Sequence, residues 1–273
     1  MDLVRLPHPN TLLTVESLDY PNPYDFNIPH RHDYFEIVLI KNGGGEQLID
    51  FTKTALTSNS IYVIYPRQIH LLNRDKAEGL LIQFRKDVFE FIFPLQHHYL
   101  YFTNPEVQLK KNDFDHLYEL TQNILSLYKS DTLSPLSIHK SFSYLQIVLI
   151  SLIEFRQQKS LNPSDNFAGQ FLQLVSHNIK EKRKVSEYAT MMNLSSDKLT
   201  ALCKASLGET PLKIIHEELL LEINRLLILG EFSLKEIAYE LNFESPSNFS
   251  AFVKTSTGLP PSELQAKLKR DIY

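Results

Sequence analysis

The spacing of apolar residues changes along the chain from a strand period to a helix period. Between residues 28 and 89, apolar residues form short runs separated by turn formers, with predicted strands at 34–40, 48–51, 60–65 and 80–84. Many short strands at close spacing favour an antiparallel barrel or jelly roll. From residue 113 onward the apolar residues recur at helical spacing. The pattern therefore predicts two domains, an N-terminal β-barrel followed by an all-α domain.

Two helices are expected directly after the β region, at residues 113–129 and 134–158. In the second helix, apolar residues recur at alternating spacings of four and three, like a coiled-coil seam. The residues of this predicted seam are Ile138, Phe142, Leu145, Leu149 and Leu152. We expect the seam to meet the same helix of a second subunit, because symmetric dimers are the commonest oligomers. The alternative is that the helix packs wholly within the monomer.

The C-terminal part of the chain contains an internal repeat, with similar blocks at residues 185–208 and 233–258. Each block has a short amphipathic helix with a small alanine, a turn, a second helix and a closing glycine. Ser195 is the expected N-cap of the second helix in the first block. In the second block Ser245 takes that role, and Pro246 occupies the first helical position. Each block therefore predicts a helix-turn-helix.

One further helix, at residues 211–229, joins the two blocks. Thr210 is its expected N-cap, and Gly230 follows its end. Ser233 and Glu236 then form a capping box that opens the second block. Such a helix would fix the separation of the two blocks, which suits adjacent major-groove segments on one face of DNA.

The second helix of each block has one apolar stripe and an opposite face of small and polar residues. A face of this kind can enter a major groove. The candidate DNA-contacting residues are Ser196, Asp197, Lys198, Thr200, Ala201, Lys204, Pro246, Ser247, Asn248, Ser250, Ala251 and Lys254. A basic run at residues 180–184 directly precedes the first block, and it is interpreted either as a solvated helix end or as a phosphate contact.

The C-terminal region resembles the DNA-binding domain of the AraC/XylS family of bacterial transcription regulators. The resemblance is carried by LKEIA at 234–238, FESPSNF at 243–249, Lys254, Gly258 and PPSE at 260–263, and it covers about residues 167–268. It implies a regulator that binds double-stranded DNA as a homodimer, responds to a small-molecule effector such as a sugar, and contacts RNA polymerase if it is an activator. Ala201 and Ala251 stand where relatives often carry a base-reading arginine.

The β region carries a second constellation, His30-x-His32-x-x-x-Glu36 followed by Pro66-x-x-x-His70. It resembles the metal motif of cupin barrels, and strand parity would let the first three residues point inward from one strand. Three imidazoles and one carboxylate suit several transition metals. Sugar-responsive members of the resembled family carry a similar pattern that serves folding and effector binding. We therefore expect His30, His32, Glu36 and His70 to bind a small polar effector, with no metal, no cofactor and no enzymatic activity.

Two alternatives remain open beside the effector-responsive regulator. One is a metal-dependent cupin enzyme with a DNA-binding tail. The other is a ligand-independent dimeric regulator whose barrel only dimerises.

Composition narrows the class of protein. The net charge is −4 over 273 residues, and residues 167–273 contain equal numbers of basic and acidic side chains. A neutral DNA-binding domain predicts modest non-specific affinity, because phosphate neutralisation supplies most of that affinity. The single cysteine, Cys203, is expected in a buried helix stripe and suits a reducing cytosol. The N-terminus lacks a hydrophobic signal core, and the most apolar run, 145–155, is too short to span a bilayer. A cytoplasmic protein without a membrane partner is expected.

These observations predict four segments. Residues 1–110 form an irregular arm (1–27) and a cupin-like sensor barrel, and residues 111–159 form a helical dimerisation segment. Residues 160–166 contain proline and several turn formers and are the expected linker. Residues 167–273 form the tandem helix-turn-helix domain.

Overall fold

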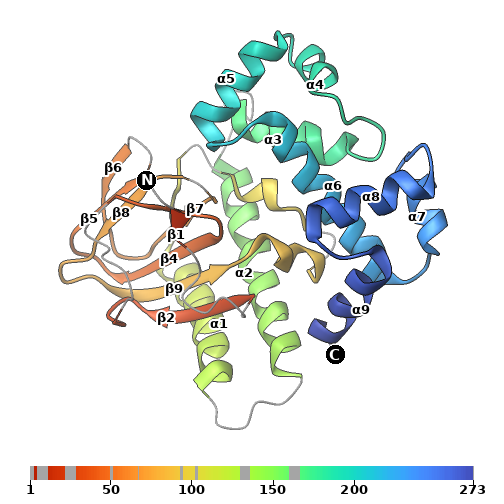
Figure 1. The fold of residues 1–273 in the computed structure, drawn as a ribbon. Coiled ribbons are helices and arrows are strands. Elements are labelled where there is room, and N and C mark those ends of the chain that lie inside the picture. Colours follow the sequence, from red (N-terminus) through yellow and green to blue (C-terminus); the bar gives the residue numbers. More distant parts are fainter. Residues whose placement is uncertain are drawn as a thin grey trace. The chain divides into compact units, whose positions relative to one another are not determined.

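The computed structural model of the chain describes residues 3–4, 12–21, 29–49, 52–66, 68–92, 95–101, 104–129, 136–159 and 167–272. The chain divides into two compact units, Met1–Gly169 and Gln170–Tyr273 (Figure 1). The expected linker, 160–166, and most of the expected arm lie outside the described residues.

The first unit is built on a five-stranded antiparallel sheet with the order β10-β7-β4-β9-β2. Its strands are β2 (Leu13–Ser17), β4 (Phe35–Asn42), β7 (Ser60–Ile64), β9 (Glu78–Phe84) and β10 (Glu106–Gln108). A smaller antiparallel sheet has the order β6-β5-β8, with β5 (Glu46–Ile49), β6 (Thr52–Ala55) and β8 (His70–Asn73). Two short strands, β1 (Leu3–Val4) and β3 (Arg31–His32), pair in parallel. The first unit is therefore a β-sheet domain, to which helices are added.

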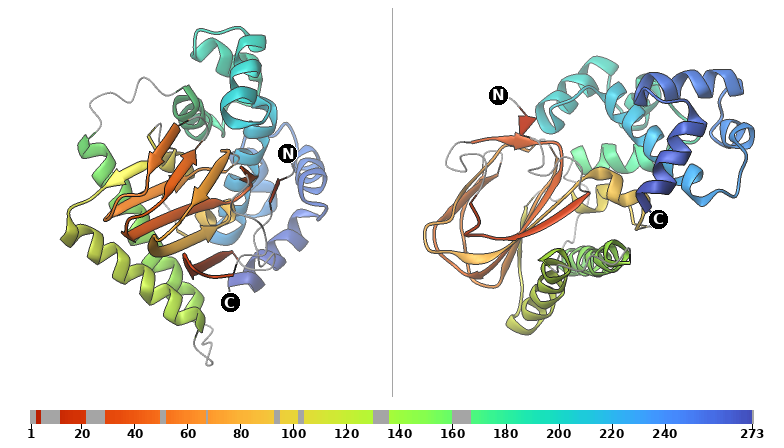
Figure 2. Two further views of the ribbon diagram at one scale, coloured as in Figure 1. Left: turned by 90° about the vertical axis from the view of Figure 1, so that its left-hand side faces the viewer. Right: turned by 60° about the horizontal axis from the view of Figure 1, so that its bottom comes forward.

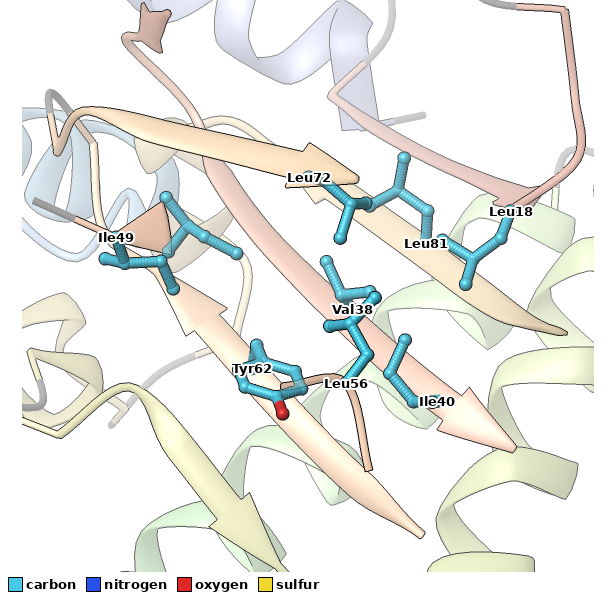
Figure 3. Packing of buried hydrophobic residues seen from close by; sticks show 9 residues of the cluster. Leu18, Val38, Ile40, Ile49, Leu56, Tyr62, Leu72 and Leu81 are labelled. Carbon is cyan, nitrogen blue, oxygen red and sulfur yellow. The ribbon is translucent and has the colours of Figure 1, made fainter. Parts of the chain in front are cut away.

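Strand β4 reads FEIVLI over its first six residues, and all six side chains are buried. Successive side chains of a strand point to opposite faces. Val38 and Ile40 join a core cluster with Ile49 and Leu72 of the smaller sheet, so this face of β4 meets that sheet (Figure 3). Helix α1 (Lys111–Lys129) covers the other face of the larger sheet, where it contacts β2 and β9 (Figure 2). Burial on both faces explains why β4 is almost continuously apolar.

Six strands were not predicted from the sequence, namely β1, β2, β3, β6, β8 and β10. The expectation of an irregular arm over residues 1–27 is wrong for Leu13–Ser17, because this segment pairs with β9 at the edge of the larger sheet. The run predicted at 48–51 instead forms β5 at Glu46–Ile49. Each missed strand has five residues or fewer, so its own pattern is weak and its pairing partner decides its structure.

The predicted seam of helix α2 (Ser137–Lys159) lies in the core of the chain itself. Leu145, Leu149 and Leu152 are fully buried, and Phe142 stacks on Phe91 with ring centroids 5.3 Å apart. Ile138 is half-buried, and α2 packs along α1 and contacts β10 and the 3₁₀ helix η2 (His97–Leu100). A second 3₁₀ helix, η1 (Lys86–Glu90), follows β9. The burial of Leu145, Leu149 and Leu152 within the chain favours the alternative, in which this helix packs inside the monomer.

The second unit is all-helical. Its helices are α3 (Phe167–Asn178), α4 (Val185–Met191), α5 (Ser196–Leu207), α6 (Pro211–Leu229), α7 (Leu234–Glu240), α8 (Pro246–Thr257) and α9 (Pro261–Ile272). Helix α6 has buried residues along its whole length and contacts α5, α7 and α9. The two repeats are thus α4–α5 and α7–α8, and α6 joins them as predicted.

The predicted caps are confirmed. The side chains of Ser195, Thr210 and Ser245 accept hydrogen bonds from backbone N–H groups in the first turns of α5, α6 and α8. Ser233 and Glu236 form the expected capping box, and Gly230 ends α6 with a left-handed backbone at φ 68°. An N-cap of this kind contributes about 1 kcal/mol to stability.

The two blocks also share an unusual turn. Asn193 and Asn242 occupy equivalent positions and have positive φ values of 55° and 56°. Asparagine enters this left-handed region more readily than most residues with a Cβ. In both blocks the next N–H donates to the carbonyl of the small alanine, Ala189 or Ala238, at 2.8 Å. The sequence repeat is therefore also a structural repeat, although the second turn has one more residue before its N-cap, Ser245.

No helix within the described ranges is long and apolar enough to cross a lipid bilayer.

The burial of the α2 seam predicts a large loss of stability in Leu149→Ala. We expect the free energy of unfolding to fall by about 2–5 kcal/mol, since the variant loses buried contacts and leaves a cavity. The matched control is Ile147→Ala on the same helix, where the side chain is 45% exposed, and the loss should stay below about 1 kcal/mol. Urea denaturation followed by circular dichroism measures both. Equal losses in the two variants would contradict the packing described.

Burial of Cys203 predicts an inert thiol. The side chain is fully buried in α5, and burial raises the pKa of its thiol to about 12. The thiolate is the reactive form, so at pH 8 the native chain should react with Ellman's reagent at least about 100-fold more slowly than the denatured chain. Comparable rates before and after denaturation would show that α5 does not bury this residue.

Candidate functional site

The second helices of the two repeats, α5 and α8, each have one buried side and one exposed side. Leu199 and Cys203 of α5 and Phe249 and Val253 of α8 are fully buried. The exposed candidate residues are Ser196, Asp197, Lys198, Ala201, Lys204, Ser247, Asn248, Ser250, Ala251 and Lys254, while Thr200 and Pro246 are half-buried. Both helices therefore offer solvent a surface of small, polar and basic side chains.

The basic run before the first repeat is partly engaged within the second unit. Lys180 Nζ lies 3.1 Å from a carboxylate oxygen of Glu240 and 3.6 Å from one of Glu222. The guanidinium of Arg183 lies 3.9 Å above the ring of Phe243, a cation–π contact. These two side chains tie α3 and its following turn to α6, α7 and the second repeat. Their role in the structure argues against a simple phosphate contact by the whole run.

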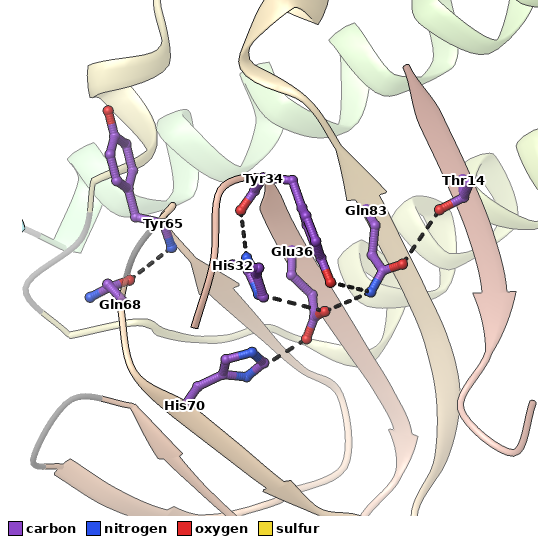
Figure 4. A network of polar contacts seen from close by, with 8 residues as sticks. All are labelled: Thr14, His32, Tyr34, Glu36, Tyr65, Gln68, His70 and Gln83. Atoms are coloured by element: carbon purple, nitrogen blue, oxygen red, sulfur yellow. Dashed lines mark hydrogen bonds and ion pairs between the residues drawn. The ribbon is translucent and has the colours of Figure 1, made fainter. Parts of the chain in front are cut away.

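In the first unit, His32, Glu36 and His70 form a fully buried cluster (Figure 4). The expectation of one continuous strand from His30 to Glu36 is wrong, because a bend at 33–34 separates β3 from β4. The bend turns His32 toward the carboxylate, so His32 Nε2 lies 3.8 Å from Glu36 Oε2. His70 arrives from β8 and places its Nδ1 3.8 Å from Glu36 Oε1. Among the described residues, one ligand atom from each of the three lies within 4.8 Å of the others.

The ring of His32 is held in one orientation. Its Nδ1 lies 2.7 Å from the backbone carbonyl oxygen of Tyr34, which can only accept a hydrogen bond. The proton of the neutral ring is therefore on Nδ1, and Nε2 presents a lone pair to the cluster. The ring of Tyr34 stacks on that of His32 with centroids 3.9 Å apart.

Glu36 is positioned by a glutamine that was not predicted as a site residue. Gln83 lies opposite Glu36 in the β4–β9 register, and its amide donates to Glu36 Oε2 at 2.9 Å. Thr14 Oγ1 in turn donates to Gln83 Oε1 at 3.5 Å. A buried polar residue within the apolar run GLLIQF is the sequence signal that identifies Gln83.

His30 and Gln47 lie at the border of the cluster. His30 exchanges both backbone hydrogen bonds with His70, and their rings lie 4.3 Å apart, whereas the His30 and His32 rings are 6.2 Å apart. Gln47 is fully buried on β5, on the same face as Leu72 of the core cluster. The site is thus built mainly from His32, Glu36 and His70, with His30 behind His70.

Burial controls the protonation of the cluster. It raises the pKa of Glu36 to about 7, although the hydrogen bond from Gln83 opposes this shift. Burial lowers the pKa of His32 to about 3, partly opposed by the hydrogen bond to the Tyr34 carbonyl, and holds the pKa of His70 well below its usual value. Both imidazoles are therefore neutral at pH 7, and their ring nitrogens can act as ligands.

Comparison with protein families assigns each unit. Residues 188–267 match the model of a helix-turn-helix domain, and residues 13–113 match that of an AraC-like ligand binding domain. Together the two matches cover well over half of the chain.

Curated relatives match over nearly the whole length. The HTH-type transcriptional activator RhaS of Pectobacterium atrosepticum is 25% identical over 245 residues, covering 86% of both chains. The protein of the same name from Yersinia pestis is 23% identical over 256 residues, covering 88% of this chain and 89% of the relative.

Solved structures of similar proteins are more distant. ToxT from Vibrio cholerae, solved with a bound unsaturated fatty acid, is 20% identical, and the match covers 93% of this chain and 94% of ToxT at a TM-score of 0.37. A regulator with an AraC-type DNA-binding domain from Chromobacterium violaceum is 26% identical. That match covers 38% of this chain and 96% of the regulator, at a TM-score of 0.34.

The repeat, its caps and the two family matches together identify the chain as a transcription regulator and not an enzyme. The chain belongs to the AraC family of DNA-binding transcription regulators, with an N-terminal AraC-like ligand-binding domain and a C-terminal helix-turn-helix domain.

Proposed function

We propose that the chain is an effector-responsive transcriptional activator that inserts α5 and α8 into two successive major-groove segments of one DNA site. The observation that carries this proposal is the exact repetition of the capped, exposed helix in the two blocks. A helix on the outside of a helix-turn-helix is the element that reads the major groove. Two such helices on one rigid core would recognise a longer site than one helix can.

The core between the two helices supports a fixed spacing. Helix α6 is buried along most of its length, and protein interiors are close-packed. The contacts of Lys180 with Glu222 and Glu240 add ties across the same unit. The angle and distance between α5 and α8 are therefore set before DNA binds.

The side chains on the two exposed faces suggest distinct roles. Lys198, Lys204 and Lys254 would pair with phosphates, which supplies affinity for any sequence. Hydroxyl and amide groups such as Ser247 and Asn248 would hydrogen-bond base edges. Ala201 and Ala251 are small enough to let the backbone approach the groove and to contact a thymine methyl group.

The first unit would receive the effector. The two sheets would close into a barrel around the face that carries His32, Glu36 and His70, with His30 beside them. Among the described residues, His32 Nε2, Glu36 Oε1 and both ring nitrogens of His70 have no hydrogen-bond partner, and neither does the amide of Gln47. Unpaired buried polar groups are costly, so a ligand that pairs with them would bind there. A small hydroxyl-rich molecule, with sugars as the leading class, offers the matching donors and acceptors.

The relatives named as activators support activation as the outcome of binding. The partners would then be double-stranded DNA, the effector and RNA polymerase, in the cytoplasm. Effector binding would change how the two DNA-binding units of a dimer are held relative to each other.

The dimer interface would use the face of α2 that remains open. Ile147 and Ile150 are 45% and 39% exposed, while the seam lies inside the chain. We expect the double variant Ile147→Glu, Ile150→Glu to be monomeric in sedimentation while its melting temperature stays within a few degrees of wild type. The control is Ile147→Ser, Ile150→Ser, in which a weakened dimer should persist at higher protein concentration. A dimeric glutamate variant would exclude this face.

The DNA interface predicts unequal effects of two exposed lysines. Lys254→Ala should weaken binding to all DNA sequences and reduce the slope of log affinity against log salt by about 1, because one phosphate contact is lost. Lys267→Ala removes an equally exposed lysine from α9, outside the repeats, and should leave the slope unchanged. Fluorescence anisotropy over a salt series measures both.

The hydroxyl on the same helix should behave differently. Ser247→Ala should change the discrimination between bases at one position of the site by about 1–3 kcal/mol, with little change in non-specific affinity.

The two lysine variants also give the result that would contradict this interface. If Lys254→Ala and Lys267→Ala shift the salt slope equally, α8 does not lie on the DNA.

A further inference from the structure

Three side chains with lone pairs, His32, Glu36 and His70, face one another inside the first unit. His32, Glu36 and His70 are each fully buried. Among the described residues, His32 Nε2, Glu36 Oε1 and both ring nitrogens of His70 lack a hydrogen-bond partner. A buried group of this kind costs on the order of 1–3 kcal/mol. Several of them at one point indicate a missing binding partner.

The distances are too long for the three side chains to hydrogen-bond one another. The two contacts between imidazole nitrogens and the Glu36 carboxylate are 3.8 Å long, beyond the range of a hydrogen bond. Donor atoms that share one metal at about 2.1 Å lie on the order of 3 to 3.5 Å apart. The observed spacing is at most 4.8 Å among the three ligand atoms, so a contraction of about 1–2 Å would bring them to that geometry.

The surrounding groups are those that prepare metal ligands. A metal-bound histidine usually donates its other N–H to a carbonyl or carboxylate, which fixes the tautomer and the ring. His32 does this with the Tyr34 carbonyl at 2.7 Å. Ligating carboxylates are likewise hydrogen-bonded, and Gln83 donates to Glu36 Oε2 while Oε1 stays open. These contacts leave His32 Nε2 and Glu36 Oε1 without a hydrogen-bond partner among the described residues.

We propose that His32, Glu36 and His70 form a binding site for one divalent transition-metal ion. Two imidazoles and a carboxylate favour such ions over Mg²⁺ or Ca²⁺, which prefer oxygen ligands. Three protein ligands leave coordination positions open, and an oxygen of the effector can fill them. The ion would thereby join the effector to the domain. This site reverses the sequence-based expectation of no metal, and it goes beyond the proposed DNA-binding function.

The test uses full-length protein without a histidine tag, stripped with a chelator and then titrated with Co²⁺ and Zn²⁺. We expect one Co²⁺ per chain with visible d–d absorption, displaced by Zn²⁺, and a rise in melting temperature with each metal. Glu36→Gln should weaken Co²⁺ binding at least about 100-fold, because it removes a charged ligand. The control His98→Gln alters a buried histidine outside the cluster and should bind Co²⁺ like wild type.

The melting temperature of the metal-free protein shows whether Glu36→Gln has lost only a metal ligand or has also lost its fold. Glu36→Gln should melt no lower than metal-free wild type, since its amide can donate to an imidazole nitrogen and carries no buried charge. Wild type should then gain thermal stability from Zn²⁺ while the variant gains none. The proposal is overturned if wild type binds no Co²⁺, or if Glu36→Gln and His98→Gln bind it equally. DNA binding is measured in a separate experiment, so neither result of the metal titration supports or contradicts the proposed DNA interface.

Discussion

The burial of helix α6 is the constraint on which the DNA-binding unit depends. This helix contacts α5, α7 and α9, and ten of its 19 residues are buried. A close-packed interior moves between discrete arrangements and does not deform continuously. The two exposed helices therefore share one rigid support, and specificity would reside in a fixed pair of helices. In the proposed dimer, regulation would then act through the first unit, which would bring two copies of this support together.

The first unit differs from the DNA-binding unit because it buries a group of polar side chains. Its larger sheet is buried on both faces, and β4 carries a carboxylate, Glu36, in the middle of that buried structure. Burial of a carboxyl group is unfavourable unless its oxygens are paired, and within the described part of the chain only Oε2 of Glu36 accepts a hydrogen bond, from Gln83. Sites that break the local rules of folding are often functional sites. The unpartnered polar atoms of the cluster therefore support the proposal that it binds a ligand.

The sequence predicted features that are encoded locally. Caps such as Ser195 and Ser233 depend on residues three positions away, and the repeat is visible as repeated letters, so both were confirmed. Features that depend on distant partners were missed or wrong. The apolar period of α2 identifies a buried stripe around Leu149, but it cannot say whether the cover is the same chain or another. Likewise His30, His32 and Glu36 show the parity of one strand, and only tertiary pairing introduces the bend between β3 and β4.

The central claim, that α5 and α8 read DNA together from one rigid unit, is tested most directly by hydroxyl-radical footprinting on a regulated promoter. Each monomer should protect two short segments on one face of the DNA, about 10 base pairs apart from centre to centre. The spacing should stay the same with and without effector, because α6 fixes it. A single protected segment per monomer, or a spacing that changes with effector, would contradict the account.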